Sequence, residues 1–341
     1  MCKIKNDPTV PPVLLRLYGG NVLPRDAPIR TLNEVTETLL FFHLGEINQG
    51  PKLLGTFEGG RIEEFVSGFT LSLSDFVTNS KVALALAKVL AKYHRINVPV
   101  PRKAWDVANI AKICYQKFKE SYPQFGNSYL TPGGALGEYE SLRGIIEFDV
   151  DEFTSWIERT MKVIEMRIVF THNDANRSNI IVKGSSSDLS GQDLDQRLLL
   201  IDCEFSGYSY RGFDIGNAFC MRKFDFAGEK FLSGYDYPDV TDRRLFVQAY
   251  QEDMRKSGFH SDWNEDEIDS IDHILMESEF GAICTRFINI VWCLRDLSHW
   301  KSIIEMRASL DPDFSSRGMN SFPNFVKERR NAFVAKWPQF A

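Results

Sequence analysis

The sequence predicts an α+β protein with a small β-rich N-terminal lobe over residues 1–67 and a large, mainly helical lobe over residues 68–341. Short apolar runs and glycine pairs characterise the first part, whereas helical spacing of apolar residues characterises the chain from Ser80 onward. At 341 residues the chain is long enough to form more than one lobe. We expect Ser67-Gly68 to be the hinge between the two.

Three segments predict the elements of the small lobe. Val13–Tyr18 is typical of a buried strand, and Pro51–Phe57 with Arg61–Val66 predicts a two-stranded hairpin around Gly59-Gly60. Leu32–Ile47 has helical spacing. The apolar side of this helix is expected to consist of Val35, Leu39, Leu40, Phe42 and His43.

Helices dominate the predicted large lobe. Ser80–His94 is clearly amphipathic, and Ala104–Ser121 and Asp151–Met166 are further helical stretches. The polar segment Gly184–Arg197 predicts a solvated loop between two strands, and the chain from Asp242 onward is mostly helical. The apolar face of the first helix is predicted to carry Val82, Leu86, Val89 and Tyr93.

Composition and charge exclude several classes of function. Hydrophobic residues make up 43% and charged residues 25%, and a net charge of −6 argues against a general nucleic-acid binder. No run reaches the roughly 20 apolar residues that a membrane span needs, so we expect no membrane insertion. Phe280–Leu294, interrupted by Arg286 and Asn289, predicts a buried helix. The 6 scattered cysteines, without a CxxC pair, predict buried thiols in a reducing, cytoplasmic compartment.

Two apolar runs each end in residues suited to phosphoryl transfer. The first leads into His172-Asn173-Asp174, with Asn179 shortly after, and the second ends in Asp202. Transfer from Mg-ATP to a hydroxyl group uses one Asp to accept the proton and an Asn with another Asp to hold Mg²⁺. We therefore expect Asp174 to be the catalytic base, and Asn179 and Asp202 to be the metal ligands; an Asp that caps a turn is the alternative.

Further residues fit the same chemistry with open alternatives. Glu204 would point the same way as Asp202 along an extended chain and contact a second Mg²⁺, or it is a surface carboxylate. Arg16 in the first strand would pair with ATP phosphates, oriented by Glu37 or Glu34. His172 is expected to hold the loop by hydrogen bonds rather than react. Asp214, near the start of a helix, would accept hydrogen bonds from the catalytic loop.

Five segments together are typical of one family: Val13–Gly19, Gly50–Leu54, Gly60–Val66, His172–Asp174 and Tyr208–Asn217. They resemble the choline/ethanolamine kinase family from residue 13 nearly to the C-terminus. The resemblance implies a protein-kinase-like bilobal fold and transfer of the ATP γ-phosphate to an amino-alcohol hydroxyl. Such a reaction feeds phosphatidylcholine and phosphatidylethanolamine synthesis.

The resemblance also implies individual roles. Asp174 would be the base, Arg16 would bind phosphate, and the Glu64–Val66 backbone would hold adenine at the hinge. Arg211, followed by Gly212, resembles the choline-kinase branch more than the ethanolamine-kinase branch. Aromatic rings attract ammonium groups, so the amine would lie against aromatic side chains. These would be Phe205, Phe226 and Trp292. Because the family is often dimeric, a homodimer or a heterodimer with a paralogue is implied as well.

The sequence departs from the family pattern in three places. Only Met1–Pro12 precede the first strand, where family members have two strands and a Gly-rich phosphate loop, so we expect this lobe to be incomplete. Ala175–Ser178 replaces the usual Gln-Glu-Gly-like run after the catalytic Asp. In the amine pocket, Phe205 and Phe226 replace tyrosines, Met221 a glutamate and Asn289 a tryptophan.

The leading interpretation is an ATP-dependent choline kinase, with ethanolamine as a further acceptor. Two other interpretations compete with it. A kinase of the same fold with another small alcohol, such as an aminoglycoside or methylthioribose, is one. A non-catalytic or truncated member that regulates an active paralogue is the other. The departure at the N-terminus favours the regulatory interpretation, whereas the retained Asp174, Asn179 and Asp202 favour catalysis.

Overall fold

The computed structural model describes residues 11–18, 34–125, 136–185, 188–191, 193–224, 236–256, 267–310 and 317–341. The chain divides into two compact units. Unit 1 comprises Met1–Lys103, Val169–Ser209 and Arg244–Asp262, and unit 2 comprises Ala104–Ile168, Tyr210–Arg243 and Trp263–Ala341. The lobe boundary expected near residue 67 stays a prediction.

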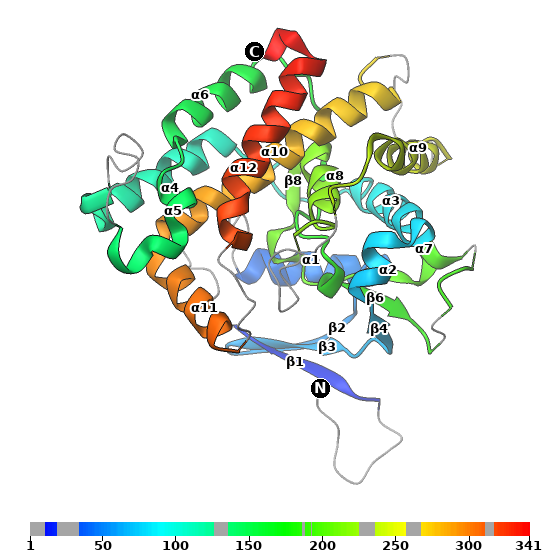
Figure 1. The fold of residues 1–341 in the computed structure, drawn as a ribbon. Coiled ribbons are helices and arrows are strands. Elements are labelled where there is room, and N and C mark those ends of the chain that lie inside the picture. Colours follow the sequence, from blue (N-terminus) through cyan, green and yellow to red (C-terminus); the bar gives the residue numbers. More distant parts are fainter. Residues whose placement is uncertain are drawn as a thin grey trace. The chain divides into compact units, whose positions relative to one another are not determined.

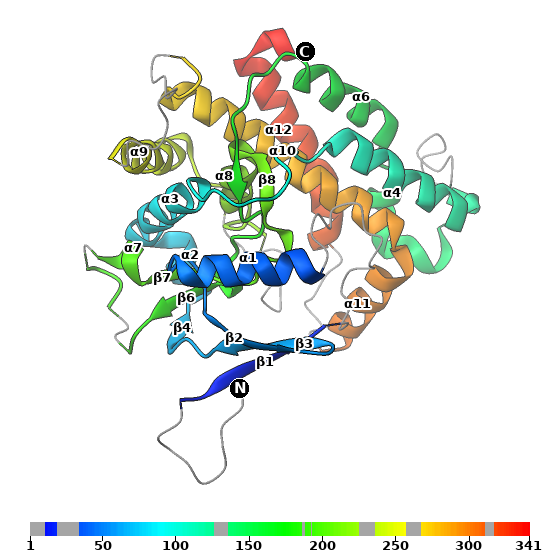
Figure 2. The ribbon, with the colours of Figure 1, turned by 180° about the vertical axis from the view of Figure 1, so that it is seen from behind.

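Unit 1 begins with an antiparallel sheet of three strands in the order β1-β3-β2. These are β1 (Val13–Leu17), β2 (Leu53–Phe57) and β3 (Gly60–Glu64), and Figures 1 and 2 show β3 between its neighbours. The register aligns Arg16 with Arg61. A Cβ at Gly60 would collide with the carbonyl of Arg16, which explains the glycine at this position. The predicted strand and hairpin are confirmed, but the strand is not buried as predicted, since Leu15 and Leu17 of β1 are 43% and 70% exposed.

Helix α1 (Glu34–Glu46) lies along this sheet, which confirms the predicted helix, but of its predicted apolar face only Leu40 is buried. Val35, Leu39 and Phe42 are exposed by 69%, 63% and 48%, whereas Glu37 is buried. Apolar residues occur all around the helix, so their spacing alone did not select a face. The buried side carries Leu40, Phe41 and Leu44 together with Glu37, which forms an ion pair with Arg61 of the sheet.

The rest of unit 1 carries two further sheets, and helices α2 (Leu73–Thr78) and α3 (Ser80–His94) lie between the first sheet and the end of the unit's first chain segment. Strands β4 (Gly68–Thr70), β6 (Ile180–Lys183) and β7 (Leu198–Leu200) form one antiparallel sheet, and β5 (Ile168–Thr171) pairs with β8 (Gly207–Tyr210). Helix α3 has the predicted bounds, and its predicted apolar face is buried.

The segment between β6 and β7 is more ordered than a solvated loop. It contains a short helix, α7 (Leu194–Arg197), and buries Leu189 and Leu194. Lys92 Nζ of α3 lies 2.6 Å from Asp195 Oδ2 of α7. The predicted connection between two strands is confirmed by the antiparallel pairing of β6 and β7, and most described residues of 184–197 are exposed; Leu189 and Leu194 are the buried exceptions.

Helix α10 (Ile271–Arg295) is the buried centre of unit 2, as predicted for Phe280–Leu294. Helices α4 (Val107–Ser121), α8 (Arg211–Cys220) and α12 (Arg317–Lys336) pack on it, and Figure 1 shows α12 crossing α10. The remaining helices are α5 (Arg143–Ile146), α6 (Val150–Met161) and α11 (Leu297–Leu310) of unit 2, and α9 (Val240–Lys256), most of which belongs to unit 1. Five 3₁₀ helices complete the described elements: η1 (Pro123–Phe125), η3 (Gly137–Leu142), η4 (Arg177–Asn179), η5 (Cys203–Phe205) and η6 (Pro338–Phe340).

Glycines allow α8 and α10 to pack closely within unit 2. A Cβ at Gly281 of α10 would overlap the backbone of Gly212 and Phe213, and a Cβ at Gly216 of α8 would overlap the backbone of Ser278 and Ala282. The contact therefore brings the two backbones together directly. Any side chain there would force the helices apart.

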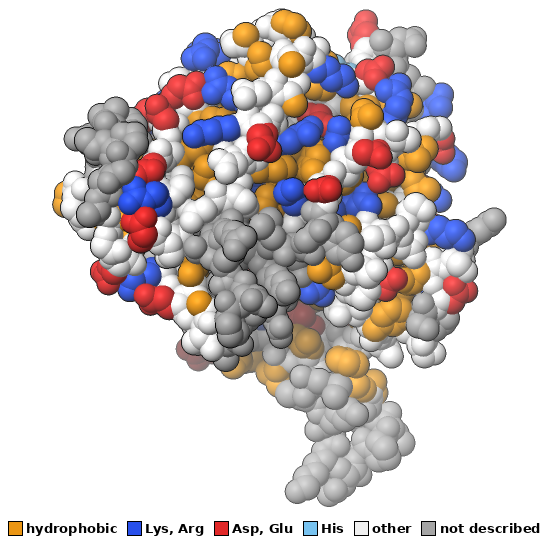
Figure 3. Space-filling view, viewed as in Figure 1, with side chains coloured by type: hydrophobic (Ala, Val, Ile, Leu, Met, Phe, Trp, Pro, Cys, Tyr) orange, Lys and Arg blue, Asp and Glu red, His pale blue; other side chains and the backbone are white. Residues whose placement is uncertain are grey.

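The described helices, the charged surface and the cysteines can each be compared with what the composition predicts. None of the described helices is long and apolar enough to span a bilayer. On the face drawn in Figure 3, acidic and basic side chains are interspersed rather than gathered by sign. The described cysteines, Cys114, Cys203, Cys220, Cys284 and Cys293, are free and buried, as predicted.

Candidate active site

The loop after β5 positions Asp174 through its two preceding residues. Asn173 has a left-handed backbone (φ 64°) and donates from Nδ2 to the carbonyl oxygen of Phe205 at 2.9 Å. Asn and Asp adopt this backbone more readily than most other non-glycine residues. The strand direction therefore turns sharply at Asn173, just before the Asp174 side chain.

His172 is buried and holds the loop with both ring nitrogens. Its Nδ1 accepts from the Asp174 backbone N–H at 3.3 Å, so the ring proton lies on Nε2. Nε2 donates to the carbonyl oxygen of Ile201 at 3.0 Å. A neutral histidine thus links the Asp174 loop to the end of β7.

The Asp174 carboxylate is held by two amides of the same loop. Asn176 Nδ2 donates to Oδ1 at 3.0 Å, and Asn179 Nδ2 donates to Oδ2 at 2.7 Å. Burial raises the pKa of Asp174 to about 7, assisted by the negative charges of Asp202 and Glu204 and opposed by the amide hydrogen bonds. A carboxyl group with a pKa near neutrality is suited to general base catalysis.

Asp202 follows β7 in a left-handed backbone conformation (φ 63°). The Ile201 N–H donates to the Asn179 carbonyl at 2.9 Å, so the strand end and the catalytic loop are fixed to each other. Arg16 Nη2 lies 2.7 Å from Asp202 Oδ1 and 3.9 Å from Glu204 Oε2. Unit 1 therefore brings together the predicted base, the three predicted metal ligands and the predicted phosphate-binding arginine.

The donor set fits a magnesium ion. Among the described residues, no group of three or more His, Cys, Asp or Glu could hold a metal. Magnesium, however, is typically held by one or two carboxylates and keeps water and phosphate as its other ligands. Asn179 donates from Nδ2 to Asp174, so its Oδ1 is the atom that could bind a cation. Asn179, Asp202 and Glu204 thus supply hard oxygen atoms suited to Mg²⁺.

Arg61 is the residue that the sequence analysis missed. It is 1% exposed and donates from Nη1 to Glu37 Oε1 at 2.8 Å and from Nε to Glu63 Oε1 at 2.7 Å. Its guanidinium carbon also lies 4.4 Å from the ring centroid of Phe41. Arg61 and Glu63 are two residues apart and therefore lie on the same face of β3. The sequence signal that could have revealed Arg61 was Glu37, a carboxylate among the apolar residues of α1.

The remaining predicted binding residues are dispersed. Glu64 ends β3 and accepts from the Lys52 N–H at 3.0 Å, and Val66 follows it outside any regular element. Phe205 of unit 1 and Trp292 on α10 of unit 2 are both partly exposed. Phe226 lies outside the described residues. The roles of these residues stay predictions.

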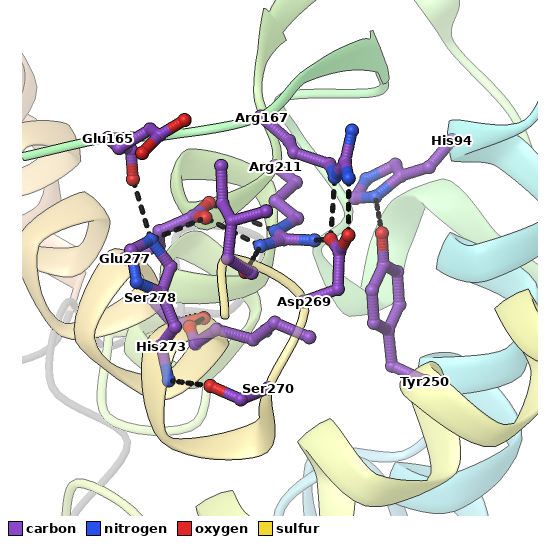
Figure 4. A network of polar contacts seen from close by, with 12 residues as sticks. His94, Glu165, Arg167, Arg211, Tyr250, Asp269, Ser270, His273, Glu277 and Ser278 are labelled. Carbon is purple, nitrogen blue, oxygen red and sulfur yellow. Dashed lines mark hydrogen bonds and ion pairs between the residues drawn. The ribbon is translucent and has the colours of Figure 1, made fainter. Parts of the chain in front are cut away.

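Arg211 and Asp214 lie buried on α8 of unit 2. Figure 4 shows the Arg211 guanidinium between Glu277 and Asp269, with Arg167 on the other side of Asp269. Arg211 Nη1 lies 2.5 Å from Asp269 Oδ1, and Arg167 Nε lies 2.6 Å from the same atom. The geometry gives Arg211 a role in holding unit 2 together.

Comparison with known proteins identifies the family. The family model of the choline/ethanolamine kinases matches residues 1–325. The chain belongs to the choline/ethanolamine kinase family. The choline/ethanolamine kinase of Rattus norvegicus is 29% identical over 285 residues, which cover 82% of this chain and 65% of the rat protein. The Homo sapiens choline/ethanolamine kinase is 27% identical over 291 residues, which cover 84% of this chain and 66% of the human protein. The chain thus spans just under two thirds of the length of these curated relatives.

Solved structures confirm the predicted α+β, protein-kinase-like fold class. The choline kinase of Cryptosporidium parvum is 17% identical with a TM-score of 0.63, and the match covers 97% of this chain and 85% of that one. The ethanolamine kinase of Plasmodium vivax is 22% identical with a TM-score of 0.53, over 96% of this chain and 76% of that one. At such identities the likeness concerns the fold alone.

Proposed function

We propose that the chain is an ATP-dependent kinase that phosphorylates the hydroxyl group of choline or ethanolamine. Family membership supports the reaction class, and the relatives are themselves choline and ethanolamine kinases by name. The observation that carries the proposal is the Asp174 carboxylate, held by Asn176 and Asn179 beside Asp202 and Glu204. This arrangement suits transfer of a phosphoryl group to an alcohol.

In the proposed reaction, Asp174 orients the acceptor hydroxyl and accepts its proton late in the transfer. The acceptor oxygen forms a bond to the γ-phosphorus of ATP while the bond from that phosphorus to the β,γ-bridging oxygen breaks. ADP leaves with the electron pair of the broken bond, and the proton passes from the hydroxyl to an Asp174 carboxylate oxygen. Asn176 and Asn179 keep that carboxylate in place throughout.

Arg16, Asn179 and Asp202 serve the nucleotide in this proposal, with Glu204 as a further ligand. Bound Mg²⁺ would neutralise the charge that develops on the phosphate oxygens. Asn179 and Asp202 would hold it, and Arg16 would contact phosphate. The Glu64–Val66 backbone would bind adenine.

For the acceptor we propose an amine site of aromatic side chains. Phe205 and Trp292 are partly exposed, as a ring that contacts a ligand must be. Ring faces attract ammonium groups by about 0.5–2 kcal/mol each. Phosphocholine formed in this way would be the first product of the CDP-choline route to phosphatidylcholine. A cytoplasmic location and dimerisation also belong to the proposal.

The test is ³¹P NMR of the purified protein with Mg-ATP and, in separate samples, choline, ethanolamine or no acceptor. We expect a phosphomonoester with at least one amine. Asp174→Asn should reduce its rate by about 10²–10⁴-fold, the usual contribution of a general base. Glu158→Gln is the matched control, because Glu158 is an exposed carboxylate paired only with Lys112 among the ion pairs described.

No phosphomonoester from a folded wild-type protein with either amine would contradict the proposal. If Mg-ATP still raised the melting temperature of that protein, a kinase for another alcohol would replace it. Without such a rise, the regulatory partner of an active paralogue would be the better description.

A further inference from the structure

Arg16 occupies the carboxylates that the metal would need. Its Nη2 contacts Asp202 Oδ1 at 2.7 Å and approaches Glu204 Oε2 at 3.9 Å. The side chains of Arg16, Asp202 and Glu204 are 30%, 30% and 35% exposed, so solutes can reach all three. The contact is an ion pair that an incoming cation can displace.

The neighbouring arginine does not share these carboxylates. Arg61 stands opposite Arg16 in the register of β1 and β3, but its guanidinium is paired with Glu37 and Glu63. Arg61 and Arg16 repel each other, whereas Asp202 attracts Arg16. Asp202 is therefore the direct partner that compensates the charge of Arg16, with Glu204 at 3.9 Å and the attraction of Glu37 as smaller contributions.

A divalent cation bound alone would meet a penalty at this site. It would compete with Arg16 for the Asp202 carboxylate, and Arg16 would lose its 2.7 Å ion pair while the cation and the guanidinium repel each other. A nucleotide phosphate would remove that penalty, because it offers Arg16 another anion while the cation takes Asp202. The bound nucleotide thus raises the affinity for the divalent cation, and the bound cation raises the affinity for the nucleotide.

We propose that Arg16 is an internal counter-cation that moves from Asp202 to a nucleotide phosphate, which makes divalent cation and nucleotide binding cooperative. The nucleotide half of this inference rests on the proposed kinase function. Linkage requires the effect to be mutual: the nucleotide strengthens cation binding by the same factor by which the cation strengthens nucleotide binding. Free divalent cation is thereby disfavoured relative to the cation–nucleotide complex.

The test measures Mn²⁺ binding by EPR, with ADP binding by calorimetry, for wild type and Arg16→Gln. Without nucleotide, Arg16→Gln should bind Mn²⁺ about two- to fivefold more tightly, the gain expected when a partly exposed ion pair no longer competes. It should bind metal-free ADP more weakly, and Mn²⁺ should strengthen ADP binding less than in wild type. Arg95→Gln is the matched control, since Arg95 pairs with Asp253 in the same unit.

Two more variants separate the possible results. In Asp202→Asn, the additional Arg16→Gln change should bring no gain in Mn²⁺ affinity, because the competition is for the Asp202 carboxylate. Arg16→Lys keeps the charge and should keep the weak Mn²⁺ binding of wild type. A gain in Arg16→Lys equal to that in Arg16→Gln would overturn the proposal, and this comparison holds even if Arg16→Gln melts at a lower temperature.

Unchanged or weaker Mn²⁺ binding by folded Arg16→Gln would also overturn the counter-cation role. Wild type that still bound Mn²⁺ together with ADP would then leave the proposed kinase function standing. Wild type that bound neither ligand would refute the kinase function and this inference together.

Discussion

Arg211 of α8 donates from Nη2 and Nε to the two carboxylate oxygens of Glu277 on α10, at 2.6 and 3.0 Å. Both side chains are fully buried, and Asp269, also buried, accepts from Arg211 Nη1. Burial raises the pKa of Glu277, while the charge of Arg211 opposes that rise. Two carboxylates thus depend on one guanidinium, assisted at Asp269 by Arg167.

We predict that Arg211→Met destabilises the protein by about 3–5 kcal/mol, because it leaves buried carboxylates without their partner. Urea unfolding followed by circular dichroism measures the effect. Arg143→Gln is the control, since the ion pairs of Arg143 with Glu140 and Glu147 lie near the surface. Equal stability of wild type and Arg211→Met would show that the network contributes nothing to unit 2.

The close contact of α8 and α10 gives a second prediction. Gly281→Ala should destabilise by about 3 kcal/mol, because its Cβ would overlap the backbone of Gly212 and backbone cannot move aside cheaply. Gly55→Ala is the matched control: its Cβ would lie 3.8 Å from Ile62 Cδ1, an ordinary contact. Urea unfolding of both variants checks this, and similar stabilities would contradict the close packing.

The buried thiols predict a dependence on pH. Burial raises the pKa of Cys203 from 9.0 to about 12. The folded protein therefore keeps a proton that the unfolded chain releases, so this contribution to stability is complete below pH 9 and is lost as the pH rises toward 12. Cys203→Ala should lose less stability over that range than wild type, as measured by thermal melting at successive pH values.

Alkylation tests the same burial directly. At pH 8 iodoacetamide should leave Cys114, Cys203, Cys220, Cys284 and Cys293 unmodified in the native protein and modify them in urea, because the thiolate is the reactive form. Peptide mapping by mass spectrometry identifies the sites. Rapid native modification of any of these thiols would contradict their burial.

Local patterns carried most of what the sequence predicted correctly. Helix α3 has an apolar stripe along one side, and Asn79 caps its first turn by accepting hydrogen bonds from Lys81 N and Val82 N. Both signals are local, and the bounds and the apolar face of this helix were predicted correctly. The loop around Asp174 was recognisable because Asp174 and Asn179 are close in sequence and contact each other directly.

Long-range pairing accounts for what the sequence did not predict. The buried face of α1 includes Glu37, whose partner Arg61 is 24 residues away and belongs to a different element. The helical spacing of Val35, Leu39 and Phe42 does not indicate that these residues are exposed and that the carboxylate of Glu37 is buried. The predicted amine site is harder still, because Phe205 and Trp292 belong to different units.

The buried ion pairs of Arg61 with Glu37 and Glu63 give the last prediction. Arg61→Met should destabilise by about 3–5 kcal/mol, since Glu37 and Glu63 would remain buried without the guanidinium. The loss should be larger at pH 8 than at pH 4. At pH 8 the variant would bury two negative charges without a compensating guanidinium, whereas protonation of carboxylates in acid removes such a charge. Urea unfolding at both pH values measures the difference, and adding Glu37→Gln should recover part of the loss at pH 8. A loss that is the same at both pH values, with no recovery, would mean that Arg61 acts through packing on Phe41 rather than through its charge.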